Sequence, residues 1–495
     1  MVLDNYQPAN VWKYFEEIAA IPHGSGNTEA IADYIMDFAA KHELEAQKDE
    51  VGNVVVYRPA SEGYENSKPV ILQGHMDMVI AKNDSCTKDL AKEGLELEII
   101  KGGEPTAETA KQYEHDEWLS AKGSSLGADD GIAVAYMLAI LESDEIKAPA
   151  ITAVFTMDEE VGMIGAHGLD ADLLKGNILI NIDNETEGEF ITGCAGGMTV
   201  QCDVPVGKEL ISPYVIELRI DGLTGGHSGV EIDQYRLNAI KAMGRILLGV
   251  FQNFGMRILT IDGGEVDNAI PKKSEAAIIV LEEVKDDAIA LIKKMFDEIK
   301  EEYKDTDPNM KLTLNEVGEQ EVRAFGDAST LAAIIPIVNF PDGVIRVNNT
   351  FGSVETSNNI GVIRTLEDRV RIESTIRSTK RSAKLNVLEQ MKSITEIFGG
   401  EVNITSDYEG WEPNKDSEVS KVFAKAYEDV YGNKPVITQT HAGLECGILG
   451  GKIEGMDAIS FGPQADDIHT FNEKLSIKSV ERVWNVLIKG LESMK

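Results

Sequence analysis

Five short segments of the sequence combine imidazole and carboxylate side chains in patterns that could bind a metal ion. They are Gly74-His75-Met76-Asp77, Leu126-Gly127-Ala128-Asp129-Asp130-Gly131, Asp158-Glu159-Glu160-Val161-Gly162, Asn181-Ile182-Asp183, and Gly462-Pro463 followed by His469. Imidazole nitrogens and carboxylate oxygens are the usual protein ligands of zinc, manganese and cobalt. Each segment alone also has an ordinary explanation, as a hydrogen-bonded pair, an acidic turn or a helix cap. The segments predict chemistry only if the fold brings them together.

The helices and strands expected around these segments predict that the fold brings them together. Four of the segments directly follow short apolar runs, at residues 70–72, 151–155, 178–182 and 458–461. Such runs are typical of strands buried on both faces, and their alternation with helices indicates an α/β domain with a mostly parallel sheet. The remaining segment, 126–131, begins an apolar helix at 131–142. Because ligands bind at the carboxyl ends of parallel strands, the five segments are expected to meet at one edge of the sheet.

The middle of the chain has a different order of expected strands and helices. Residues 215–317 predict strand, helix, strand, strand, helix and strand, which is the order of a ferredoxin-like βαββαβ unit. A second, less complete copy follows, with elements expected at 328–337, 360–365, 369–376, 383–398 and 401–406. We therefore expect an α/β domain built from residues 1–203 and 409–495, interrupted by an inserted α+β domain at 204–408 that could act as a lid.

Composition limits the class of protein. A chain of 495 residues exceeds what a single core usually supports, so several domains are expected. The formal net charge of −37 argues against a nucleic-acid partner, because a phosphate backbone requires a basic surface. No apolar run is long enough to span a bilayer, and the acidic N-terminal region does not resemble a secretory signal. These features predict a cytoplasmic protein with no membrane partner and with reduced cysteines.

In their order along the chain, the five segments resemble those of the M20 metallopeptidases. Two further segments resemble the Xaa-His dipeptidase (aminoacyl-histidine dipeptidase) branch of that family. They are His441-Ala442-Gly443-Leu444-Glu445-Cys446-Gly447 and Gly222-Leu223-Thr224-Gly225-Gly226-His227-Ser228-Gly229-Val230. The resemblance extends from near residue 10 to the C-terminus. One departure is Phe471, which stands where a proline is common in the family after the last histidine.

The resemblance implies a dinuclear metal site with five ligands. His75 and Asp183 would bind one divalent ion, Glu160 and His469 would bind the other, and Asp129 would bridge the two. The expected cofactor is two Zn²⁺ ions per chain, with Mn²⁺ or Co²⁺ able to substitute. Asp77 would fix the tautomer of His75, as the His-x-Asp spacing permits. Asp130 receives no role.

The resemblance also implies catalytic and substrate-binding residues. Glu159 would be the general base for a metal-activated water, and His227 would stabilise the oxyanion. Arg377 would bind the substrate carboxylate, for which Asn359 is a further candidate. His441 and Glu445 would line the substrate cleft. A surface charge for Arg377 and a structural hydrogen bond for His441 remain open as alternatives.

The expected function is therefore hydrolysis of the peptide bond of dipeptides, including carnosine-like Xaa-His substrates. Small peptides would be the partners, and a homodimer formed through the inserted domain is left open. An M20 tripeptidase, carboxypeptidase or amidohydrolase is the alternative within the family. A catalytically inactive metal-binding protein is the alternative of another class, and such a protein would be expected to lack Glu159 or a ligand.

Overall fold

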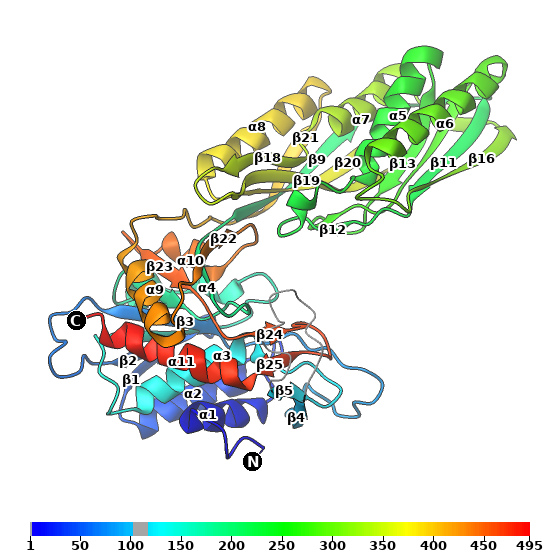
Figure 1. The fold of residues 1–495 in the computed structure, drawn as a ribbon. Helices are drawn as coiled ribbons and strands as arrows, with labels where there is room; N and C mark the ends of the chain where they lie inside the picture. The colour runs from blue at the N-terminus through cyan, green and yellow to red at the C-terminus, as the bar shows by residue number, and fades with distance from the viewer. Residues whose placement is uncertain (1, 102–116) are drawn as a thin grey trace. The chain divides into compact units, whose positions relative to one another are not determined.

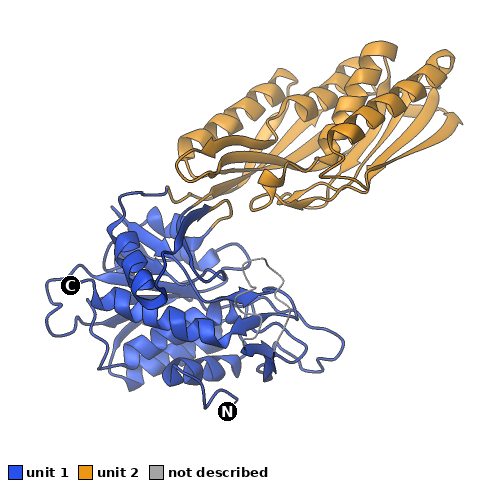
Figure 2. Ribbon diagram, viewed as in Figure 1, with its two compact units in different colours: residues 1–193, 413–439, 444–495 blue, residues 194–412, 440–443 orange. Residues whose placement is uncertain are grey.

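The computed structural model describes residues 2–101 and 117–495, and the chain forms two compact units (Figure 2). Unit 1 comprises Met1–Gly193, Pro413–Gln439 and Leu444–Lys495, and unit 2 comprises Cys194–Glu412 and Thr440–Gly443. The boundaries expected at 203/204 and 408/409 therefore lie at 193/194 and 412/413. The first boundary moves because β9 (Gly196–Pro205) pairs with strands of unit 2.

The main sheet of unit 1 is mixed, in contrast to the mostly parallel sheet expected from the sequence. Its order is β1 (Glu45–Lys48), β2 (Val54–Arg58), β6 (Ile151–Thr156), β3 (Val70–His75), β7 (Ile178–Asn181), β23 (Asp457–Ser460), β8 (Glu189–Cys194) and β22 (Val436–Thr440). The four central strands β6, β3, β7 and β23 pair in parallel. β2 and β8 pair antiparallel to this group. The short turn between β1 and β2 permits only antiparallel pairing, since a parallel pair needs a long crossover.

The helices of unit 1 pack around this sheet. They are α1 (Ala9–Ala19), α2 (Glu29–Lys41), α3 (Ala128–Glu142), α4 (Ile164–Gly168), α9 (Glu418–Tyr431), α10 (Glu445–Gly450) and α11 (Ile477–Glu492), with a short 3-10 turn at Ala171–Leu173. α3 is buried on almost every side, as its continuous apolar sequence predicts. Tyr136 of α3 donates a hydrogen bond to the carbonyl of Val480 and stacks on Trp484, both in α11. α3 is therefore held rigidly within the core.

A second, smaller sheet in unit 1 carries part of the C-terminal region. Its order is β24 (Ala465–Asp466), β25 (Lys474–Ser476), β5 (Glu117–Ala121) and β4 (Leu97–Lys101). β24 and β25 form an antiparallel hairpin, and β25 also pairs with β5. Among the described helices of the chain, none is both long and apolar enough to cross a membrane.

Unit 2 is an antiparallel sheet with helices on one face (Figure 1). The strand order is β16 (Lys311–Glu319), β11 (Tyr214–Asp221), β15 (Ser274–Val280), β13 (Arg257–Gly263), β19 (Ser353–Thr365), β20 (Arg369–Ser378), β9 and β21 (Glu401–Asp407), and β18 (Gly343–Asn348) pairs with β19. The helices are α5 (Ala239–Phe254), α6 (Lys285–Glu302), α7 (Asp327–Asn339) and α8 (Arg381–Ile397), with 3-10 turns at Ile232–Gln234 and Glu282–Val284. Two small ribbons, β10 (Lys208–Ile211) with β17 (Val322–Phe325) and β12 (Gly226–His227) with β14 (Ala269–Ile270), complete the unit.

Two βαββαβ arrangements lie side by side in this sheet. The first runs β11-α5-β13-β15-α6-β16, and its first strand lies between its third and fourth. The second runs β9-α7-β19-β20-α8-β21 and has the same arrangement, with β9 between β20 and β21. The first arrangement is therefore inserted into the second, between β9 and α7. β9 is the first strand of the second copy, which the sequence-based expectation did not include.

Candidate metal and catalytic site

The parallel strands of unit 1 end at a common edge, and candidate ligands follow them there. His75 is the last residue of β3 and lies opposite Thr156, the last residue of β6. Glu160 lies in the loop after β6, and Asp183 follows β7, which pairs in parallel with the other side of β3. The carboxyl ends of parallel strands are the usual ligand-binding edge of such a sheet. The buried apolar strands thus place three of the five expected ligands together.

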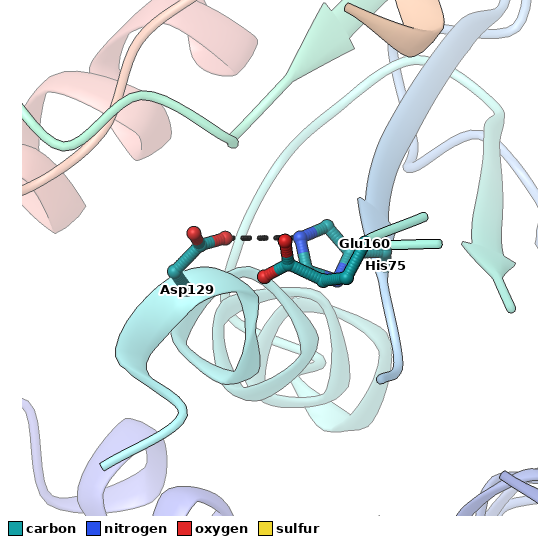
Figure 3. A group of neighbouring side chains, drawn as sticks. All are labelled: His75, Asp129 and Glu160. Atoms are coloured by element: carbon teal, nitrogen blue, oxygen red, sulfur yellow. Dashed lines mark hydrogen bonds and ion pairs between the residues drawn. The ribbon is translucent and has the colours of Figure 1, made fainter. Parts of the chain in front are cut away.

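Asp129 lies between the two histidines that are candidate ligands, His75 and His469. Its Oδ1 atom is 2.9 Å from His75 Nε2, and its Oδ2 atom is 3.0 Å from His469 Nε2. His469 Nε2 is also 2.9 Å from Glu160 Oε1, and His75 Nε2 is 3.7 Å from Asp183 Oδ1. His75, Asp129 and Glu160 point toward one another from β3, the start of α3 and the loop after β6 (Figure 3). One carboxylate facing two imidazoles is the arrangement expected of a bridging ligand.

The chemistry of this donor set fits divalent cations. Three overlapping groups have ligand atoms within 4.8 Å of one another: His75, Asp129 and Glu160; His75, Asp130 and Asp183; and Asp129, Asp183 and Glu185. Burial raises the pKa of both Glu160 and Asp183. Among the residues that the structure describes, no lysine or arginine forms an ion pair with any of these carboxylates. Because buried carboxylates are costly without a compensating cation, the donor set suits bound metal ions.

Asp77 connects the candidate ligand His75 to the loop after β6. Nδ1 of His75 lies 2.9 Å from the backbone oxygen of Asp77 and 3.4 Å from its Oδ1 atom. The Asp77 carboxylate accepts the backbone N–H groups of Glu159 and Glu160, at 2.9 and 3.4 Å, and the hydroxyl of Ser25 at 2.8 Å. With Nδ1 engaged in this way, Nε2 of His75 is the nitrogen free to act as a ligand.

Glu159 lies beside the candidate ligands without joining any of the three groups. Burial raises its pKa well above the ordinary value, and the neighbouring carboxylates of Asp183 and Glu445 act in the same direction, against His75. The loop is held by hydrogen bonds from the N–H groups of Gly162 and Met163 to the carbonyl of Glu159. A glutamate with a raised pKa next to a metal site is suited to accept and return a proton.

Two acids at this edge were not assigned a role from the sequence. Asp130 is buried, and its Oδ2 atom accepts the backbone N–H of His75 at 3.2 Å. Glu185 lies two residues after Asp183 and close to both Asp183 and Asp129. The only sequence signal for Glu185 was a second acid in the segment after β7, which by itself indicates an ordinary polar turn.

Arg377 of unit 2 is a buried cation without a carboxylate partner among the described residues. It is 6% exposed, and its Nε atom has no hydrogen-bond partner. Its Nη1 atom donates to the hydroxyl of Tyr408 at 3.3 Å. A buried guanidinium ordinarily has an anionic partner. This environment favours an anion-binding role over the alternative of a solvated surface charge.

His227 has one nitrogen committed as an acceptor. Its Nδ1 atom accepts the backbone N–H groups of Gly229 and Val230, at 3.2 and 3.1 Å. Burial lowers the pKa of His227, and the charge of Arg377 lowers it further. The neutral imidazole therefore carries its proton on Nε2, which can donate a hydrogen bond.

His441 is buried in unit 2 and binds a serine of β19. Its Nε2 atom lies 2.7 Å from the hydroxyl of Ser357, which faces Arg377 across the β19–β20 pair. Burial lowers the pKa of His441 to about 3, and the charge of Arg377 acts in the same direction. The structural hydrogen bond left open for this residue is present, and His441 also lies in the electrostatic neighbourhood of Arg377 and His227.

Two candidate substrate contacts have other roles in this structure. The side-chain amide of Asn359 is buried and donates to the carbonyls of Asp267 and Ala269, which ties β19 to the start of β14 and the residues before it. Glu445 is fully buried and accepts hydrogen bonds from Gln73 at 2.5 Å and Thr156 at 2.7 Å. A direct contact of either side chain with substrate is not supported, because both are packed inside a unit. Local sequence does not show burial of this kind.

Comparison with known proteins agrees with the motifs. Residues 71–493 match the model of peptidase family M20/M25/M40. The chain is 34% identical over 496 residues to the cytosol non-specific dipeptidase of Escherichia coli (strain K12), covering 99% of both chains. The structure resembles that of the aminoacylhistidine dipeptidase from Vibrio alginolyticus, with a TM-score of 0.90, 36% identity and coverage of 99% and 97% of the two chains. The fold is also similar to that of aminopeptidase PepT from Bacillus cereus, with a TM-score of 0.57, 15% identity and 99% coverage of both chains.

These matches extend over nearly the whole chain and include every segment of the candidate site. The α/β fold and the family resemblance expected from the five segments are confirmed. The chain belongs to peptidase family M20/M25/M40 and is a hydrolase acting on peptide bonds.

Proposed function

We propose that this enzyme is a dinuclear metallo-dipeptidase that hydrolyses dipeptides with a free carboxyl terminus, Xaa-His substrates among them. The observation that carries the proposal is Asp129, whose two carboxylate oxygens face His75 and His469 separately. Asp183 would complete the site of His75, and Glu160 would complete that of His469. The names of the similar E. coli and Vibrio enzymes support the choice of a dipeptide substrate.

The chemistry requires a Lewis acid and a proton carrier. Two divalent cations, for which Zn²⁺ is the expected identity and Mn²⁺ or Co²⁺ the substitutes, would lower the pKa of a water and polarise the scissile carbonyl. Glu159 accepts the proton of the attacking water and returns it to the leaving amine. The raised pKa of Glu159 supports this role, because it makes the carboxylate a stronger proton acceptor than an ordinary glutamate.

Unit 2 contributes the groups that suit the rest of a dipeptide. His227 can donate from Nε2 to the oxyanion that forms during attack on the carbonyl. Arg377 can bind the substrate carboxylate through its guanidinium group, whose Nε atom has no hydrogen-bond partner. His441 stays neutral beside it, so the positive charge available to the carboxylate is that of Arg377. A free C-terminus is therefore part of the proposed substrate.

The cellular location is proposed from the name of a relative, and the oligomeric state from the family resemblance. We propose a cytoplasmic location, because the E. coli relative is named as a cytosol enzyme. Small peptides are the proposed partners. A homodimer through unit 2 stays a prediction from the family resemblance.

Metal analysis combined with a panel of substrates tests the proposed function. Elemental analysis should find two divalent ions per chain, and prolonged chelation should abolish activity until metal is restored. β-Ala-His and ordinary dipeptides should be hydrolysed, whereas tripeptides, N-acylated amino acids and C-terminally amidated dipeptides should be poor substrates. Efficient cleavage of tripeptides or N-acylated amino acids would favour a different M20 activity, and full activity without metal would refute the proposal.

A further inference from the structure

The carboxylate of Glu473 binds the backbone at the start of α3, far away in the sequence. Its Oε2 atom accepts the N–H groups of Leu126 and Gly127, at 2.7 and 3.0 Å. Its Oε1 atom accepts those of Ala128 and Asp129, at 2.8 and 3.5 Å. Leu126 and Gly127 precede the helix, whereas Ala128 and Asp129 supply its first N–H groups, which have no partner within a helix. α3 has no side-chain cap of its own, and the backbone of Asp129 and Asp130 departs from helical angles. Glu473 supplies that cap from the C-terminal region.

The same residue stands at the base of the loop that carries His469. β24 and β25 form a hairpin, and His469 lies in the loop between them, four residues before Glu473. The backbone carbonyl of Glu473 accepts the hydroxyl of Ser120 in β5 at 2.8 Å, which fixes the end of the loop. His469 itself has a 45% exposed side chain and a left-handed backbone, with φ of 61°. A ligand in such a loop depends on an anchor for its position.

Glu473 therefore connects the two segments that present Asp129 and His469. These two side chains meet at 3.0 Å, although they are separated by 340 positions in the sequence. We propose that Glu473 is a positioning residue that sets the separation of Asp129 and His469, and thereby the affinity for the metal ion that they share with Glu160. The proposal rests on the two-metal site of the proposed function.

The carboxylate is the only side-chain group that can make all of these contacts. Both of its oxygens are acceptors, and its negative charge is favourable at a helix N-terminus. A glutamine has one acceptor, so it loses one pair of contacts and turns an NH₂ group toward backbone donors. An alanine loses every contact and leaves the buried N–H groups unpaired. The effect on metal binding should therefore increase from Glu473→Gln to Glu473→Ala.

The test is metal binding by the full-length chain after removal of bound metal, with Zn²⁺ titrated against a chelating dye. Wild type should show two binding events. Glu473→Gln should weaken one of them by about 10- to 100-fold, the range found for residues that orient metal ligands. It should be the same event that His469→Ala removes. The absorption spectrum of the Co²⁺-loaded Glu473→Gln protein should also change, since its coordination geometry depends on where Asp129 and His469 lie.

Glu187→Gln is the matched control. Glu187 is another buried carboxylate of unit 1, and it pairs with Arg482 instead of a helix terminus, through contacts of 2.7 Å. This variant should lose thermal stability but keep both metal affinities. If Glu473→Gln lowers stability and leaves both affinities at the wild-type level, Glu473 is only a structural cap and the inference is wrong. A wild-type chain that binds no divalent metal would instead overturn the proposed function, and the inference with it.

Discussion

The carboxylate of Asp77 accepts a hydrogen bond from the backbone N–H of Glu159, with the two atoms 2.9 Å apart. The same carboxylate lies 3.4 Å from Nδ1 of His75. The residue expected to orient one metal ligand thus also holds the residue expected to be the general base. We therefore expect metal binding and proton transfer to be coupled through Asp77.

Replacing Asp77 with asparagine should impair both functions. The amide has a single acceptor oxygen, so it cannot hold the Glu159 and Glu160 N–H groups and the Ser25 hydroxyl as the carboxylate does. We expect metal affinity and kcat/KM to fall by about 10- to 100-fold each. Metal titration and steady-state kinetics measure the two effects. A variant with normal affinity and normal kinetics would show that Asp77 has neither role.

Glu159→Gln should remove turnover while leaving metal content near that of wild type. Loss of a general base typically costs about 10²–10⁴-fold in rate. Glu160→Gln should instead weaken one metal, because Glu160 faces His469 at 2.9 Å. Elemental analysis and single-turnover kinetics on both variants separate the roles. Loss of metal from the Glu159 variant alone would mean that the two roles are reversed.

Arg377→Met should weaken the recognition of the substrate carboxylate. Hydrogen bonds to charged groups contribute about 1.5–3 kcal/mol, so kcat/KM should fall by about 10- to 100-fold. Amidating the substrate should cost a similar amount, and the two losses should not add, because they remove the same contact. Arg371→Met is the control, because Arg371 lies on the same strand as Arg377, β20, and forms an ion pair with Asp203 of β9. If the losses from Arg377→Met and from amidation of the substrate were additive, the substrate carboxylate would bind at a site other than Arg377.

His227→Ala should lower kcat more than it raises KM. A hydrogen bond to an oxyanion forms fully only in the transition state, and loss of one such donor costs about 10²–10³-fold in kcat. A second experiment determines which chain supplies the histidine. The His227→Ala and Glu159→Gln proteins are mixed under conditions that allow subunit exchange, and activity is measured. Recovered activity would mean that His227 acts across a dimer. A main effect on KM would instead assign His227 to ground-state binding.

The stability of the protein should fall in acid because of His441. Its folded-state pKa is about 3, below the ordinary 6.5, so the unfolded chain binds the proton more tightly. The stability associated with the neutral side chain is present above pH 6.5 and is lost as the pH falls toward 3. At pH 4.5 the loss should be about 2–3 kcal/mol relative to pH 7.5. Urea unfolding of wild type and His441→Asn at the two pH values measures it, and equal pH dependence in both proteins would contradict the prediction.

The positions of the candidate metal ligands were predictable from the sequence, because four of the five segments follow a short apolar run and the fifth, at 126–131, begins an apolar helix. Strands buried on both faces leave a clear apolar signal, and ligands gather at the carboxyl ends of such strands. His75, Glu160 and Asp183 are therefore brought together by a rule that depends only on local order. The same reasoning identified the βαββαβ order of β11 to β16 in unit 2.

Strand direction and the unit boundaries were decided by pairing between distant segments. A buried apolar run has the same composition whether its neighbour runs parallel or antiparallel, so the antiparallel β2 and β8 could not be distinguished from the central strands. β9 was assigned to the first domain for a similar reason. It precedes the inserted segment in the sequence, but it pairs with β20 and β21 in unit 2.

The contacts of single polar residues were also decided by segments that are distant in the sequence. Glu445 lies in a motif that resembles a substrate-binding segment, yet its carboxylate is buried against Gln73 and Thr156. Glu473 follows a candidate ligand histidine, His469, by four residues, yet its carboxylate binds the backbone at the start of a helix more than three hundred residues earlier in the sequence. The residue types and their spacing determined which side chains could bind metal or carry a proton. Only the tertiary structure decided which of them are exposed and which backbone groups they hold, because burial and hydrogen bonding depend on chain segments that are remote in the sequence.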